Sequence, residues 1–178
     1  MAKVSKLIGS NALSKLLFII YFLALTWIIL LKMGVRFTYM EDRQIYLIPF
    51  YEPLFLDGTF DLGEIIMNIV IFVPLGIYTG VLYMHSSWRN HISIFLTITL
   101  LFESLQYVFR LGSFDATDLL NNTLGGIIGL GIWKQMEKLT MRKELAQKIT
   151  NGIALTLTIL MLTLLILLKL NKLPIRYQ

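Results

Sequence analysis

Long apolar runs separated by short polar connections dominate the hydrophobic pattern of this chain. A helix crosses the hydrocarbon core of a membrane with about 20 residues, and several runs approach that length. They cover residues 13–33, 64–83, 92–109, 119–133 and 149–168. The fourth run is shorter and rich in glycine. Because backbone polar groups find no other partners in lipid, the pattern predicts an all-α membrane bundle of about five transmembrane helices.

Composition supports a membrane protein and limits its chemistry. Hydrophobic residues make up 56% of the chain, whereas soluble domains are about 45–50% apolar. The chain has no cysteine, so it has no disulfide and no thiolate metal site. His85 and His91 lack a metal-ligand spacing, and we interpret both as solvated loop residues. We predict no metal and no cofactor.

The basic residues indicate an orientation rather than a nucleic-acid partner. The formal net charge is +5, but lysine and arginine flank the apolar runs instead of forming a soluble patch. They are more numerous on the side that holds the N-terminus, which predicts a cytoplasmic tail at residues 1–12. Residues 134–148 form a basic cytoplasmic connection or, equally, a helical extension of the fourth span. Residues 149–178 hold the fifth span and a basic tail.

Residues 34–63 form a long connection that is rich in aromatic residues. Pro49 and Pro53 disfavour a helix there, and the composition suits a membrane interface. We interpret this loop as an aromatic cover over the end of the bundle. A lid that grips a substrate is the alternative.

Polar residues near three span ends share one side of the membrane by alternating topology. Glu103 lies inside the third run, where a carboxylate costs about 2.5–3.5 kcal/mol unless it finds a partner or water. Spacings of three and seven residues place Gln106 and Arg110 on its helix face. We therefore predict an outward-facing polar pocket. Its candidate ligand-binding residues are Asn68, Glu103, Gln106, Arg110, Asp115, Asp118, Asn121 and Asn122.

Three of these candidates also admit structural interpretations. Glu103 and Gln106 can hydrogen-bond between helices without any ligand. Asp115 can cap the helix that follows it. Close helix packing is predicted nearby, because small residues let membrane helices approach one another. The packing candidates are Pro74, Gly76, Gly125, Gly126 and Gly129.

Three blocks in this order resemble the VanZ-like membrane proteins. They are Asn68-Ile-Val-Ile-Phe-Val-Pro-Leu-Gly76, Glu103-Ser-Leu-Gln106, and the segment from Asp115-Ala-Thr-Asp118 through Asn122 to Gly126 and Gly129. Leu47-Ile-Pro-Phe50 is similar to a short family motif before the second span. The resemblance covers residues 13–133. It implies a multi-pass protein of the bacterial cell membrane that reduces susceptibility to glycopeptide antibiotics, teicoplanin in particular.

The leading hypothesis is a non-enzymatic role. The pocket would bind a lipid-linked cell-wall precursor or the lipidated antibiotic, with membrane lipids as the other partners. The alternative is an intramembrane enzyme that modifies a lipid-linked envelope component, with Glu103 and Asp118 as acid and base. Proton-coupled transport ranks last, because no inverted repeat supports it.

Overall fold

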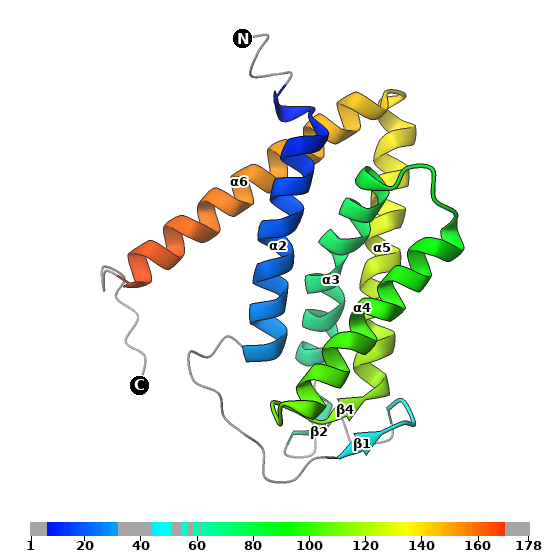
Figure 1. The fold of residues 1–178 in the computed structure, drawn as a ribbon, viewed down its shortest axis with the longest axis vertical. Helices are drawn as coiled ribbons and strands as arrows, with labels where there is room; N and C mark the ends of the chain where they lie inside the picture. The colour runs from blue at the N-terminus through cyan, green and yellow to red at the C-terminus, as the bar shows by residue number, and fades with distance from the viewer. Residues whose placement is uncertain (1–6, 32–43, 51–54, 57–58, 61, 170–178) are drawn as a thin grey trace.

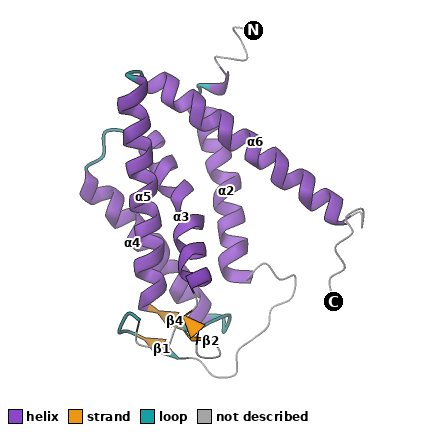
Figure 2. Cartoon of the chain, turned by 180° about the vertical axis from the view of Figure 1, so that it is seen from behind, coloured by secondary structure: helices purple, strands orange, loops and turns teal. Residues whose placement is uncertain are grey.

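The computed structural model describes residues 7–31, 44–50, 55–56, 59–60 and 62–169. Its long helices are α2 (Asn11–Leu31), α3 (Leu62–Leu82), α4 (Trp88–Val108), α5 (Ala116–Thr140) and α6 (Lys143–Lys169). Its short strands are β1 (Ile45–Tyr46), β2 (Phe55–Leu56), β3 (Thr59–Phe60) and β4 (Phe114–Asp115). The all-α fold is confirmed (Figures 1 and 2). The predicted N-terminal tail up to residue 6, the basic tail 170–178 and much of the loop 34–63 lie outside the described residues.

Four of the described helices, rather than five, are long and apolar enough to cross a membrane. They are α2, α3, α4 and α6, and the exception is α5. The polar and glycine-rich faces of α5 are buried against its neighbours, and α3 shares the largest helix–helix contact with it. Its exposed apolar residues between Leu120 and Ile132 recur every four positions and form a narrow stripe: Leu120, Leu124, Ile128 and Ile132. Its buried faces carry mostly small and polar residues, with Leu130 and Trp133 as the large apolar exceptions.

Glycines set the close approach of α3 and α5. A Cβ added at Gly129 would lie 1.9 Å from the Val73 carbonyl oxygen, and one at Gly76 would lie 1.9 Å from the Gly126 carbonyl oxygen. A Cβ on Gly125 would meet the Ile69 carbonyl oxygen at 2.2 Å. No side chain fits at these positions while the backbones stay in contact.

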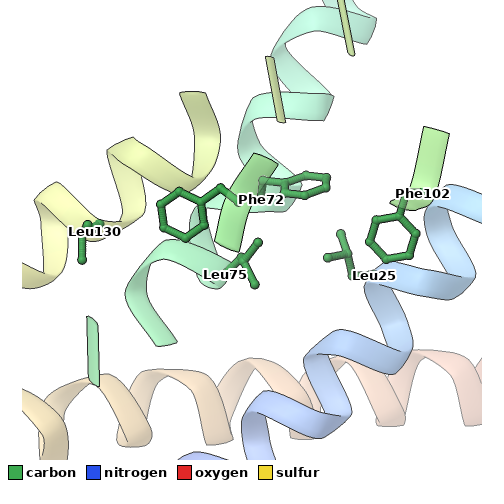
Figure 3. Close-up of a cluster of buried hydrophobic side chains, with 6 residues drawn as sticks. Leu25, Phe72, Leu75, Phe102 and Leu130 are labelled. Carbon is green, nitrogen blue, oxygen red and sulfur yellow. The ribbon is translucent and has the colours of Figure 1, made fainter. Parts of the chain in front are cut away.

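A hydrophobic cluster joins four helices beside this contact. Leu25 from α2, Phe72 and Leu75 from α3, Phe102 from α4 and Leu130 from α5 point toward one another (Figure 3). Phe95, also buried, belongs to the same cluster. This cluster places α2, α3, α4 and α5 around one core.

The start of α4 corrects one interpretation from the sequence. His91 is only 2% exposed and lies beside Phe95, with 6.5 Å between the ring centroids. It is therefore not a solvated loop residue. The helix begins at Trp88, after the N-cap Ser87, which is earlier than the apolar run indicates. His91 thus falls on a helical turn that packs against the bundle.

The connection between α5 and α6 is shorter than the predicted segment 134–148. Helix α5 continues to Thr140, Met141 adopts a left-handed conformation, and α6 begins at Lys143. The chain then runs obliquely across α2 (Figures 1 and 2). Most of the basic segment is helical because it consists largely of good helix formers such as Lys, Glu, Met and Gln.

A buried polar network fixes the start of α6 to the start of α2. The Ser14 hydroxyl donates to Asn151 Oδ1 at 3.0 Å, and Asn151 Nδ2 donates to the Ile8 carbonyl at 2.7 Å. Gln147 Nε2 donates to Asn11 Oδ1 at 2.8 Å and to Ser14 Oγ at 3.0 Å. These bonds hold only the first turns of α6, and its later turns diverge from α2 (Figure 1).

Candidate functional site

The beginning of α3, the end of α4 and the beginning of α5 meet at one end of the bundle, beside β1 and β4 (Figure 1). β1 pairs in parallel with β4, so that Tyr46 lies opposite Asp115. The Phe50 amide donates to Thr117 Oγ1 at 3.0 Å. The described part of the aromatic loop is thereby attached to the start of α5.

A cavity of about 440 Å³ opens at this end. Its deepest polar residues are Glu103, Asn122 and Gln106, which are 1%, 3% and 8% exposed. The other polar residues in its lining are half-buried or exposed: Tyr46, Glu64, Asn68, Ser113, Asp115 and Asp118. Four carboxylates therefore share one chamber with amide and hydroxyl groups.

Glu103 forms a hydrogen bond with the backbone of the N-cap residue of α5. Its Oε2 accepts a hydrogen bond of 3.1 Å from the Asp115 amide. The Asp115 carboxylate in turn caps α5, accepting from the Thr117 amide at 2.6 Å. Asp115 thus both caps α5 and lines the cavity. The acid of α4 points toward the start of α5 rather than toward lipid.

Asn68 and Asp118 join α3 to α5 across the cavity. Asn68 Nδ2 donates to Asp118 Oδ1 at 2.6 Å. Deeper in the bundle, Asn122 Nδ2 donates to Thr99 Oγ1 at 3.0 Å, while Asn122 Oδ1 is buried without a partner. An unpartnered buried acceptor is rare and calls for an explanation such as a ligand or water.

Gln106 connects the cavity to α2. Its Nε2 donates to the Ile29 carbonyl at 3.1 Å. This carbonyl belongs to the last turn of α2, where the final four carbonyls have no partner within the helix. Gln106 therefore forms a hydrogen bond between helices, as the structural interpretation of this residue expects. Its side chain also lines the cavity.

The structure brings together six of the predicted residues. Asn68, Glu103, Gln106, Asp115, Asp118 and Asn122 line the cavity. Two candidates lie elsewhere. Asn121 is buried but is not part of the lining.

Arg110, the other exception, is exposed and outside the lining. The spacing from Glu103 assumes a helix that reaches Arg110, but α4 ends at residue 108. The Leu111 amide donates to the Gln106 carbonyl at 2.8 Å and the Arg110 amide to the Tyr107 carbonyl at 3.3 Å. These two bonds define a Schellman motif. Arg110 occupies its left-handed position, with φ of 59°.

Sequence reasoning missed part of the lining. Glu64 precedes Asn68 by four residues, so that both lie on one face at the start of α3 and on the same side of the membrane. This spacing was a signal in the sequence from which Glu64 could have been predicted. Tyr46 and Ser113 come from connections whose approach depends on the β1–β4 pairing. Within the described residues, no three His, Asp or Glu side chains form a group that could hold a metal ion.

Comparison with known proteins places this cavity in a family context. The sequence model of the VanZ/LLP1 family matches residues 18–141. The chain belongs to the VanZ/LLP1 family. It is similar to the protein VanZ of Enterococcus faecium, with 31% identity over 137 residues, which cover 75% of this chain and 81% of that protein. No solved structure matches the chain. The cavity and the α3–α5 contact both lie within the VanZ/LLP1 region, and all of α6 lies beyond it.

Proposed function

We propose that this VanZ/LLP1 protein lowers the susceptibility of a bacterium to glycopeptide antibiotics, teicoplanin in particular, without catalysing a reaction. Its cavity binds a lipid-linked cell-wall precursor or the lipidated antibiotic. The observation that carries the proposal is a buried polar chamber in a membrane protein that is similar to VanZ. Such a chamber is expensive to maintain in lipid, and polar groups inside membrane helices usually mark a functional site.

Charge distribution supports an outward-facing cavity. Lysine and arginine are enriched on the cytoplasmic side of membrane proteins. The described basic residues at the helix ends away from the cavity are Lys15, Arg89, Lys134, Lys138, Arg142, Lys143 and Lys148. By alternating topology over the whole chain, nine of the 16 lysines and arginines lie on the side of the N-terminus, and the other seven, Arg110 among them, lie on the cavity side. This asymmetry favours a multi-pass protein of the cell membrane with a cytoplasmic N-terminus.

The decisive experiment compares teicoplanin susceptibility in strains with and without the gene. Expression should lower susceptibility, and Glu103→Gln should abolish much of this effect, because it replaces the buried carboxyl group of the cavity with an amide that cannot ionise. Glu144→Gln is the matched control: Glu144 is exposed at the start of α6. Membrane levels of all variants are compared by immunoblot.

Equal susceptibility of both strains, with the protein present in the membrane, contradicts the resistance role. A larger effect on teicoplanin than on vancomycin supports recognition of a lipid tail. Loss of the effect in both glutamate variants points to a general loss of function rather than to the cavity.

The enzymatic alternative has one supporting observation. Glu103 is fully buried with a backbone donor, whereas Asp118 is half-buried with an amide donor. Two carboxylates in different environments can divide acid and base roles. Mass spectrometry of envelope lipids tests this function: a new species that depends on the gene and disappears with Glu103→Gln favours it, and an unchanged profile contradicts it.

A further inference from the structure

An apolar groove of about 240 Å³ lies between α2, α3 and α6, outside the polar cavity. It exists because the polar network fixes only the first turns of α6. The later turns of α6 diverge from α2 (Figures 1 and 2). Small side chains, Ala24 on α2 and Ala154 on α6, line the resulting space.

The groove adjoins the polar cavity. Ile28 of α2 and Ile71 of α3 line both. The Tyr21 hydroxyl donates to the Ile71 carbonyl at 2.8 Å, which joins α2 to α3 beside this boundary and satisfies the polar group of a groove-lining residue. A polar chamber and an apolar groove therefore lie next to each other, with Ile28 and Ile71 at their common boundary.

We propose that the two spaces form one site for a single-chain amphiphile. Its hydrocarbon chain lies in the groove between α2, α3 and α6, and its head, rich in hydroxyl or amine donors as a sugar is, lies in the chamber. This inference rests on the proposed function in that it takes the chamber as a ligand site, and it adds the place of the tail and the chemistry of the head.

The head is assigned from the acceptors that the chamber offers. Asn122 Oδ1 is buried and unpartnered at the deep end of the chamber. The carboxylates of Glu64 and Asp115 at its rim are also acceptors. A ligand that donates several hydrogen bonds matches this set. The tail is assigned from this adjacency, since a chain that leaves the chamber past Ile28 and Ile71 comes next to the groove.

The experiment uses the full-length protein in nanodiscs and two photoreactive dodecyl glucosides, one with a diazirine at the chain end and one with a diazirine on the sugar. Cross-links are mapped by mass spectrometry. The tail probe should label Leu157 or Met161 and the head probe residues near Ser113. Both should saturate at the same concentration. Dodecyl phosphate, with few donors at its head, should compete poorly.

The groove is tested by filling it. Ala24→Trp should weaken saturable labelling by both probes by roughly tenfold or more, since extra volume in a packed site produces a clash. Ala154→Trp fills the same space from α6 and gives an independent variant. Leu23→Trp is the matched control, because Leu23 is 65% exposed on the neighbouring position of α2. Thermal unfolding checks that each variant is folded.

The proposal is overturned if Ala24→Trp and Ala154→Trp are both labelled as strongly as the wild type, or if labelling of the wild type never saturates. Either result leaves the proposed function in place. The converse result separates the two ideas. If labelling behaves as expected but expression does not change teicoplanin susceptibility, the amphiphile site stands and the resistance role fails. An unlabelled lipoglycopeptide and an unlabelled lipid-linked precursor are then each tested as competitors of probe labelling. The one that competes shows which of the two molecules provides the head group that binds in the chamber.

Discussion

At the scale of single residues, Glu103 shows how a carboxylate survives inside a helical bundle. Its side chain is 1% exposed and accepts a hydrogen bond from the Asp115 amide. Hydrogen bonds to charged groups contribute about 1.5–3 kcal/mol, which offsets part of the burial penalty. The sequence singled out this residue because an acid within an apolar run is conspicuous, whereas the amide that donates to it belongs to a different element.

Glycine positions give a direct test of the α3–α5 contact. Gly129→Ala should destabilise the protein by about 1–3 kcal/mol, because its Cβ would lie 1.9 Å from the Val73 carbonyl oxygen. Gly131→Ala is the control: no atom lies within 4 Å of its added Cβ, and alanine is favoured over glycine in a helix by roughly 0.5–1 kcal/mol. Thermal unfolding followed by circular dichroism measures both. Equal destabilisation would contradict the packing described for this contact.

At the scale of elements, α5 differs most from its expectation. The apolar run predicted a span at residues 119–133, with a helical extension into the basic segment as an equal alternative, and the helix extends from Ala116 to Thr140. Its polar faces are covered by α3 and α4. Its mean hydropathy is therefore too low for α5 to be detected as a membrane-spanning helix from hydropathy alone. Such a helix depends on its neighbours, because its asparagines and threonines would otherwise meet hydrocarbon.

Helix α6 is predicted to depend on its first turns. Asn151→Leu removes partners from Ser14 and the Ile8 carbonyl in a buried network, and leaving such groups unsatisfied costs about 1–3 kcal/mol. Hydrogen exchange should therefore increase along residues 143–163. Thr156→Val on the same helix is the control, since Thr156 is exposed and bonds within its own helix to the Gly152 carbonyl. If Asn151→Leu leaves the exchange unchanged, the network does not anchor α6.

At the scale of the whole molecule, the charge distribution bears on the orientation of the bundle. The cavity holds the carboxylates of Glu64, Glu103, Asp115 and Asp118, and by alternating topology nine of the 16 lysines and arginines lie on the side of the N-terminus. Positive charge resists transfer across the bacterial membrane. The bundle should therefore insert with its cavity facing outward.

Cysteine labelling tests this orientation without a background signal, because the natural chain has no cysteine. Arg110→Cys at the cavity end should react with a membrane-impermeant maleimide on intact cells. His85→Cys, between α3 and α4 at the other end, should react only after permeabilisation. Both native residues are exposed. The reverse pattern would place the cavity on the cytoplasmic side and contradict an outward-facing site.

The sequence alone determined the elements that depend on local order. Apolar runs, the Gly125/Gly129 spacing and the acid at position 103 are properties of neighbouring residues, and alternating topology puts span ends on common sides. Tertiary structure decided what depends on contacts between distant segments. The Schellman motif turned Arg110 away, β1–β4 pairing brought Tyr46 to the cavity, and a polar network directed α6 so that an apolar groove remained. Helix periodicity fixes a direction only within one helix, whereas a site is made by how separate helices end and meet.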